Sequence, residues 1–127
     1  MYYLQMEEVI YLYTEMIRRT GGDPGIRDER ALEEILNKPM ISFEGEDLYP
    51  DVFTKVAVLL YAMINNKPFQ DGNERIAVLA ALYSLRINGY HVIAAQDKLI
   101  EMVKDAASGR SKVDHLVTWF RKNTLPV

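Results

Sequence analysis

Two apolar runs joined by a short polar loop dominate the middle of the chain: DVFTKVAVLLYAMINNKPFQDGNERIAVLAALYSLRING, residues 51–89. After Asp51, apolar side chains recur at three- and four-residue steps, as they do on the buried face of a helix. The second run, residues 75–89, is apolar on nearly every side and ends at Asn88-Gly89, which predicts a helix enclosed by others. The stretch therefore predicts a pair of buried helices around which the rest of the chain folds.

Two shorter helices are predicted before this pair. Apolar residues at helical spacing run from Met6 to Ile17, and Gly21-Gly22 end that helix. Asp28 is placed to cap a second helix, which must stop ahead of Pro39 because the residue before a proline avoids the helical region. Glycine-rich residues between the two helices predict a turn.

The remaining segments complete the fold prediction. Residues 40–50 mix strand-forming residues with a central glycine and predict a loop or small hairpin, while residues 90–94 predict a short extended link. Residues 96–107 predict an amphipathic helix, and Ser111 with Asp114 forms a capping-box pattern for a last helix. We therefore predict one all-α domain over the whole chain, a compact bundle of about six helices with a small hairpin-like flap.

Composition narrows the class of protein. The chain has 127 residues, a formal net charge of -3 and no cysteine. It has no excess of positive charge to favour nucleic acid, and no apolar run approaches the roughly 18 to 20 residues that span a bilayer. Its first residues do not resemble a secretory signal, because they include two glutamates and no basic start. We expect a soluble cytoplasmic protein that binds neither nucleic acid nor membrane.

The polar loop, NNKPFQDGNERIA at residues 65–77, has the chemistry of an anion site. Gly72 and Asn73 fall where the loop enters a helix, whose first turn presents unpaired backbone N–H groups. Arg75 adds a permanently charged fork suited to phosphate oxygens, and Asp71 offers the single carboxylate that Mg²⁺ needs beside phosphate. The combination predicts a site for ATP, or another nucleotide triphosphate, with one Mg²⁺ ion.

The same spacing also fits a purely structural turn. Asp71-Gly72-Asn73 makes a good turn and helix cap, and Glu74 with Arg75 suits a solvated first turn, so both interpretations stay open on spacing alone. Phe69 is predicted to be a core residue that anchors the loop.

Residues 67–77, KPFQDGNERIA, resemble the signature of the Fic/Doc family, H-P-F-x-[D/E]-G-N-[K/G]-R between two buried helices. The closer match is to the death-on-curing (Doc) branch. GGDPGIRDERALEEIL, FEGEDLYPDVFTKVAVLLYAMINN and AALYSLRINGY resemble Doc segments in the same order, so the resemblance covers roughly residues 20–92. The family fold is a compact helical bundle, in agreement with the periodicity.

The resemblance implies a role for each loop residue. It assigns catalysis to Lys67, Asp71 and Arg75 and the metal ion to Asp71. It assigns the nucleotide to Gly72, Asn73, Glu74 and Arg75. It also implies a flap beside the active site, which in relatives aligns the target segment by strand-like pairing and here consists of Phe43, Glu44, Gly45, Glu46, Asp47, Leu48 and Tyr49.

The resemblance also implies an activity and partners. Family members transfer AMP, or in the Doc case a phosphoryl group, from a nucleotide triphosphate to a serine, threonine or tyrosine hydroxyl of a protein. Doc toxins act on a translation factor and are silenced by a small antitoxin protein. This chain lacks the family's self-inhibitory S/T-x-x-x-E-G/N helix, which fits inhibition by a separate partner.

Two positions depart from the family pattern. Lys67 stands where the family has the histidine that accepts the hydroxyl proton, and Glu74 stands where Doc has lysine. Lysine side chains are almost wholly protonated at neutral pH, so Lys67 is a poor base, although its charge suits a phosphate. A Lys67–Glu74 ion pair would neutralise both changes.

Three interpretations follow from these departures. In the first, the chain is a Doc-like enzyme with altered or reduced activity. In the second, it is a catalytically silent module that binds a nucleotide or a partner. In the third, Lys67 is an artificial replacement that disarms a toxic enzyme.

Overall fold

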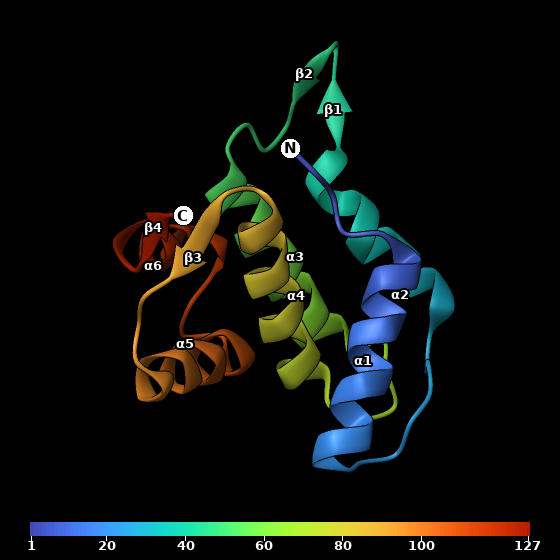
Figure 1. Ribbon diagram of the computed structural model, residues 1–127. Coiled ribbons are helices and arrows are strands. Elements are labelled where there is room, and N and C mark those ends of the chain that lie inside the picture. Colours follow the sequence, from blue (N-terminus) through green and yellow to red (C-terminus); the bar gives the residue numbers. More distant parts are fainter.

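The computed structural model describes residues 1–127 and confirms the all-α prediction (Figure 1). It contains six α-helices, one short 3₁₀ helix (η1) and two pairs of short strands. In chain order these are α1 (Met6–Thr20), α2 (Glu29–Asn37), η1 (Lys38–Met40), β1 (Ser42–Phe43), β2 (Glu46–Asp47), α3 (Val52–Asn66), α4 (Asn73–Ile87), β3 (Tyr90–Val92), α5 (Gln96–Ser108), α6 (Val113–Lys122) and β4 (Thr124–Pro126).

The α3–α4 pair lies at the centre, as the sequence predicted, but α3 is the enclosed helix. It packs against α2, α4, α5 and α6, and its side chains are buried without a break from Lys55 to Leu60. On α4, Leu79 is 37% exposed and Val78 is only partly buried, so the prediction that this helix is enclosed on nearly every side is wrong. Composition shows how apolar a helix is and not how many neighbours cover it.

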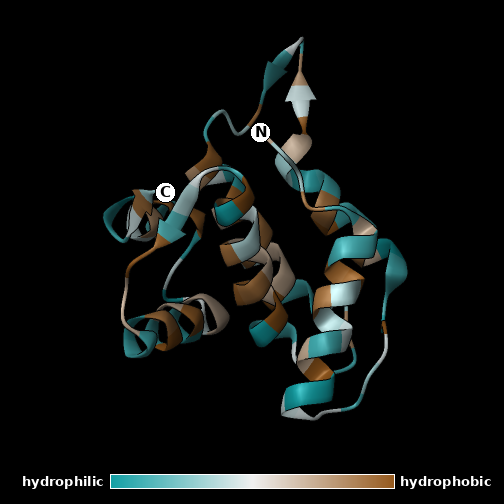
Figure 2. Ribbon diagram, viewed as in Figure 1, coloured by the Kyte–Doolittle hydropathy of each residue, from teal (hydrophilic) through white to brown (hydrophobic).

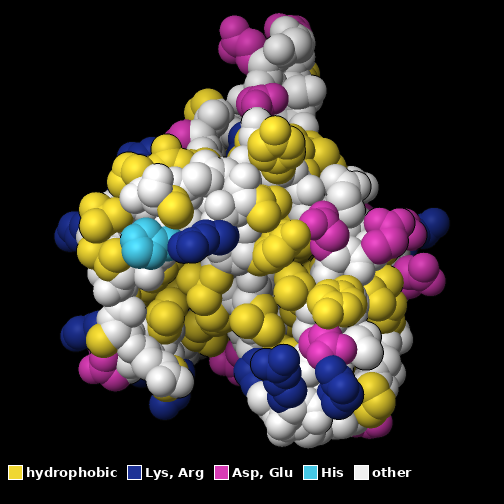
Figure 3. Space-filling view, in the orientation of Figure 1, with side chains coloured by type: hydrophobic (Ala, Val, Ile, Leu, Met, Phe, Trp, Pro, Cys, Tyr) yellow, Lys and Arg dark blue, Asp and Glu magenta, His cyan; other side chains and the backbone are white.

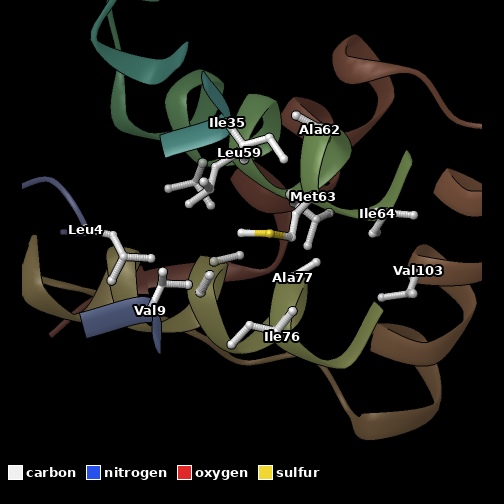
Figure 4. Close-up of a cluster of buried hydrophobic side chains, with 14 of the residues drawn as sticks. Leu4, Val9, Ile35, Leu59, Ala62, Met63, Ile64, Ile76, Ala77 and Val103 are labelled. Carbon is white, nitrogen blue, oxygen red and sulfur yellow. The ribbon is translucent and has the colours of Figure 1, made fainter. Parts of the chain in front are cut away.

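Every helix contributes to one core. Figure 2 shows apolar residues gathered on α3, α4 and the inward faces of the surrounding helices. The close-up in Figure 4 shows side chains of α1 to α5 and of the N-terminal segment meeting around α3 and α4: Leu4, Val9, Ile35, Leu59, Ala62, Met63, Ile64, Ile76, Ala77 and Val103. Burial of this set supplies the main stabilisation of the fold.

Local signals set most helix ends as predicted. Gly21, with a φ of +79°, ends α1. Asp28 accepts a hydrogen bond from the Ala31 amide at 3.0 Å, and Asp51 accepts one from the Thr54 amide at 2.9 Å, so both cap the helices predicted for them.

The predicted capping box of the last helix is wrong by one residue. Lys112, and not Ser111, is the first cap residue of α6. Its amide donates to the ring nitrogen Nδ1 of His115 at 2.9 Å, so the histidine takes the place expected for Asp114. A histidine nitrogen is an uncommon acceptor at this position, which is why the S-x-x-D pattern was the stronger signal.

The predicted hairpin is confirmed in β1 and β2. Ser42 pairs with Asp47 and Phe43 with Glu46, so only Glu44 and Gly45 form the turn. Both turn residues have positive φ, 51° and 82°, as a two-residue type I′ turn requires.

A second strand pair was not predicted. The extended link at residues 90–94 contains β3, which pairs antiparallel with β4 at the C-terminal end of the chain, with His91 opposite Leu125. The three-residue strand β4 carries no alternating pattern of its own, because its pairing depends on a segment far away in sequence.

A buried lysine ties the hairpin to the bundle. Lys55 on α3 is 3% exposed, and its Nζ donates to the Pro39 carbonyl at 2.9 Å and to Asp47 Oδ2 at 3.2 Å. The ammonium also lies 5.5 Å from the centre of the Tyr3 ring. This single charge therefore joins η1, the hairpin and the N-terminal segment.

None of the helices is both long enough and apolar enough to cross a lipid bilayer.

Candidate functional site

The loop between α3 and α4 lies next to the C-terminal end of α1 (Figure 1). The chain leaves α3 through Lys67, whose φ of +47° is left-handed, and enters α4 through Gly72, whose φ is +73°. The left-handed backbone favours glycine at position 72, and a Cβ there would also require the flexible end of Met16 to move, since its Cε would lie only 2.9 Å away. These two left-handed residues are the first and last of the six residues between α3 and α4, and they fold this loop into a tight bend.

The loop is paired with a segment far upstream in the chain. Ile26 and Phe69 form an antiparallel bridge, and the Gln70 amide donates to the Gly25 carbonyl at 3.0 Å. This segment was predicted only as a turn. Its backbone instead fixes the shape of the loop.

Arg27 holds the end of α3. Its Nε donates to the Lys67 carbonyl and one of its terminal nitrogens to the Asn66 carbonyl, both at 2.7 Å. Its own amide donates to the Pro68 carbonyl at 2.7 Å. A guanidinium at a helix C-terminus satisfies carbonyls that have no partner within the helix.

Asn73 braces the loop from the other side. Its Oδ1 accepts from the Phe69 amide at 2.9 Å and its Nδ2 donates to the Phe69 carbonyl at 3.0 Å. Phe69 is 1% exposed, which agrees with its predicted place in the core. The Asn73 side chain therefore supports the backbone of the loop, a role that the sequence did not indicate.

The first turn of α4 has unpaired donors. The first hydrogen bond at this end of the helix runs from the Ile76 amide to the Gly72 carbonyl at 2.9 Å, and the amides of Asn73, Glu74 and Arg75 donate to no protein group. Three free N–H groups at a helix N-terminus carry partial positive charge and bind anions readily.

These donors open on a polar hollow of about 410 Å³. Only one of its lining residues is apolar; the full set is Ile64, Lys67, Gln70, Asp71, Gly72, Asn73, Glu74 and Arg75. The structure thus brings all six predicted loop residues to one cavity. Neither Lys67 nor Glu74 takes part in any ion pair, so the hypothesis that they pair with each other is wrong.

Arg75 and Asp71 lie at the edge of the hollow nearest α1. Arg75 Nη1 donates to Thr20 Oγ1 and to the Gly21 carbonyl, the latter at 3.3 Å, while Nη2 lies 3.9 Å from Asp71 Oδ1. Asp71 Oδ2 accepts from the Asp23 amide at 3.3 Å. Both charged side chains are partly exposed and accessible to a ligand.

The donor set fits a phosphate chain with a magnesium ion. Nowhere in the structure do three or more histidine, aspartate or glutamate side chains converge. Mg²⁺ beside phosphate needs only one or two carboxylates, and Asp71 offers one at the hollow. The free amides and the side chains of Lys67 and Arg75 would hold phosphate oxygens.

The predicted flap does not lie beside this hollow. Residues 43–49 precede the first turn of α3, whereas the loop follows its last turn, and Figure 1 shows the two at opposite ends of the helix. A helix of 15 residues is roughly 20 Å long. The hairpin forms as predicted, but the structure does not bring residues 43–49 to the hollow.

Four residues at the site were missed by the sequence analysis: Tyr13, Thr20, Gly22 and Arg27. Gly22 has a φ of +124°, and a Cβ there would lie 2.9 Å from Asp71 Oδ2. Paired glycines followed by D-P-G were the available signal, since such a run often marks a close backbone approach as well as a turn.

An apolar groove adjoins the polar hollow. It has a volume of about 430 Å³, lies between α1, α4 and α5, and shares Glu74 and Arg75 with the hollow. The exposed Leu79 of α4 lines it.

The sequence is similar to those of known proteins. A sequence model of the Fic/DOC family matches residues 3–85. The chain is 31% identical to "Protein kinase doc" of Escherichia phage P1 over 122 residues, which cover 96% of this chain and 95% of the relative. It is 35% identical to "Toxin Doc" of Mycolicibacterium smegmatis over 95 residues, 75% of this chain and 71% of the relative. The chain therefore belongs to the Fic/DOC family.

Proposed function

We propose that this protein is a Doc-like toxin that binds ATP, or another nucleotide triphosphate, with Mg²⁺ and transfers a phosphoryl or AMP group to a protein hydroxyl. One observation carries the proposal: three unpaired amides, two cations and two carboxylates, those of Asp71 and Glu74, line the same polar hollow. The names of its relatives, a protein kinase and a toxin, support the same activity.

Different residues of the hollow would bind the phosphates and the metal ion. The amides of residues 73–75 donate to phosphate oxygens, and the bare backbone of Gly72 allows a close approach. Arg75 exchanges its bonds to Thr20 and Gly21 for bidentate bonds to phosphate. Asp71 holds the metal ion, which, when bound, neutralises charge that develops on the transferring phosphoryl group.

Transfer in this site would depend on charge and position more than on a base. The target hydroxyl oxygen forms the new bond to phosphorus, the bond to the leaving phosphate oxygen breaks, and the hydroxyl proton passes to water. Lys67, at the position where the resemblance places a base, contributes a positive charge. Such loose transition states gain most from positioning and electrostatic stabilisation, whereas a general base adds about 10² to 10⁴ in rate.

The proposed partners follow from the relatives. The target is a protein with a serine, threonine or tyrosine hydroxyl, a translation factor if the Doc pattern holds, and a small antitoxin protein inhibits the toxin. Both would be met in the cytoplasm.

Calorimetry with ATP and Mg²⁺ tests the binding step. We expect wild-type protein to bind and Arg75→Ala to bind about 10- to 100-fold more weakly, because charged hydrogen bonds are lost. Arg86→Ala is the matched control, since Arg86 is an exposed arginine in the last turn of the same helix. No heat from the wild-type protein would end the proposal.

A second candidate is a silent binding module, which the hollow favours because no histidine lines it. Growth on expression of the wild-type chain and of Lys67→His separates the two. Toxicity of both means transfer despite Lys67, and toxicity of neither means a silent module. Toxicity of Lys67→His alone identifies position 67 as the residue that decides activity. Labels on the α- and γ-phosphates of ATP then distinguish AMP transfer from phosphoryl transfer.

A further inference from the structure

Tyr13 lies on α1, far from the loop in sequence, yet it touches the loop at two points. Its ring stacks on the Phe69 ring, with centroids 3.8 Å apart and an angle of 14° between the planes. Its hydroxyl donates to the Asp71 carbonyl at 2.9 Å. The residue is 4% exposed, so water does not compete for this bond.

The hydroxyl has one proton and two nearby carbonyls. The Asp23 carbonyl lies at 3.4 Å, farther away than that of Asp71, so the proton is directed to Asp71.

The peptide that accepts this bond is the one between Asp71 and Gly72. Its orientation sets where the Asp71 side chain leaves the backbone, and it delivers the chain to Gly72 in the left-handed conformation. Asp71 Oδ1 accepts from the Gly72 amide of that same peptide at 2.8 Å. A rotation of the peptide would therefore move the carboxylate and the start of α4 together.

We propose that Tyr13 is a positioning residue for the metal-binding carboxylate: its hydroxyl fixes the Asp71–Gly72 peptide so that Asp71 faces the hollow in the orientation that holds Mg²⁺. The inference rests on the proposed function for the role of the metal, but the restraint on the loop stands on the structure alone. If Tyr13 has this role, α1 contributes a functional residue to the site.

The chain offers a matched control in Tyr83. Its hydroxyl donates to Glu8 Oε2 at 2.8 Å, so it also joins α1 to α4, and its pKa is raised by that bond. Tyr83 does not line the hollow. Tyr13→Phe and Tyr83→Phe each remove one hydroxyl and keep the ring. Both variants should therefore fold, and differences between them report the role of the hydroxyl.

Two measurements decide the role of Tyr13. Amide hydrogen exchange without nucleotide should speed up about tenfold at the hydrogen-bonded amides within residues 67–76 in Tyr13→Phe, as expected for loss of one buried hydrogen bond, and by less than about twofold in Tyr83→Phe. In titrations of ATP at varied Mg²⁺, Tyr13→Phe should need about tenfold more Mg²⁺ for its half-maximal effect, with little change in the affinity for ATP without metal.

The outcomes are distinguishable. Equal exchange of residues 67–76 in the two variants overturns the role of Tyr13, whatever the nucleotide does. Faster exchange with an unchanged requirement for Mg²⁺ also overturns it, because the loop is then held for stability alone. Failure of the wild-type protein to bind ATP overturns the proposed function, and the exchange data still report whether the hydroxyl holds the loop.

Discussion

The two ends of the α3–α4 pair differ in what their polar groups are bonded to. At the hairpin end, the Lys55 ammonium is buried against Pro39 and Asp47, and Asp51 accepts from Thr54 and Arg121. At the loop end, Tyr13, Arg27 and Asn73 bond to the backbone, while the amides of residues 73–75 and the Lys67 side chain have no protein partner.

The hairpin end is no less polar than the loop end. Figure 3 shows acidic side chains on the projecting hairpin. The difference lies in unused hydrogen-bonding capacity, which is greater at the loop end, where the supporting residues leave the donors at the start of α4 free. A candidate site is therefore recognised by polar groups that remain unpaired in a rigid setting, and not by polarity alone.

The largest effect should come from removing the aromatic anchor of the loop end. Phe69→Ala should lower the free energy of unfolding by about 3–5 kcal/mol, because Phe69 is fully buried and stacked on Tyr13. Phe43→Ala at the hairpin end should change it by less than about 0.5 kcal/mol, since Phe43 is 71% exposed. Urea denaturation measures both. Similar losses would show that the two ends are anchored alike.

A middle-sized effect is expected at the hairpin end. Lys55→Met keeps the length of the side chain but leaves the Pro39 carbonyl without its donor, which should cost about 1–3 kcal/mol of stability. ATP affinity should stay within about twofold of the wild type. Lys98→Met, at an exposed lysine of α5, is the control for loss of charge. Loss of ATP affinity in Lys55→Met would mean that the two ends are coupled.

Both ends contain a strained residue other than glycine, and relieving the strain should separate stability from binding. Lys67→Gly and Glu44→Asn should each stabilise the fold by up to about 1 kcal/mol, because both positions are left-handed. Only Lys67→Gly should weaken ATP binding, since it removes a cation from the hollow. Thermal unfolding and calorimetry test the pair; unchanged ATP affinity in Lys67→Gly would exclude Lys67 from phosphate binding.

The smallest effect is a dependence on acid at the hairpin end. Burial acts to raise the pKa of Asp51, but hydrogen bonds from Thr54 and the charge of Arg121 outweigh it, so the pKa lies below the usual 3.8. A lowered pKa in the folded state adds stability above pH 3.8 that is lost as the pH falls further. Because Asp51 is partly exposed, the contribution should be under about 1 kcal/mol.

Asp51→Asn keeps a cap for α3 but removes this charge. Its deficit in stability against the wild type should be constant near neutral pH and should shrink as the pH falls below about 3.8. Urea denaturation from pH 7 to pH 3 measures the deficit. A deficit that is the same at pH 3 as at pH 7 would assign it to the cap and not to the charge.

Features that depend on neighbouring residues could be predicted from the sequence. Gly21, Asp28 and Asp51 act within one helical turn, so their patterns reveal the helix ends. The loop residues could be assigned to one hollow because they lie within nine positions of one another, from Lys67 to Arg75. Features that depend on distant segments could not be predicted: Arg27 reaches Lys67 across 40 residues, and Tyr13 reaches Asp71 across 58.

The position of the hairpin could not be predicted for a related reason. Its strands were correctly expected from the Gly45 turn, but nothing in the sequence indicates that Lys55 would hold it against η1, at the far end of α3 from the loop. Local patterns report the form of a segment, whereas its neighbours are set by packing of the whole chain.

The bridge between Ile26 and Phe69 has a consequence for attempts to transplant the loop. A synthetic peptide of residues 65–77 would contain every phosphate-facing side chain and yet lack the backbone that clamps it. Such a peptide would be flexible in water, and we expect it not to bind ATP. Grafting the motif onto another scaffold would also require residues 22–28, because their backbone holds the loop in its shape.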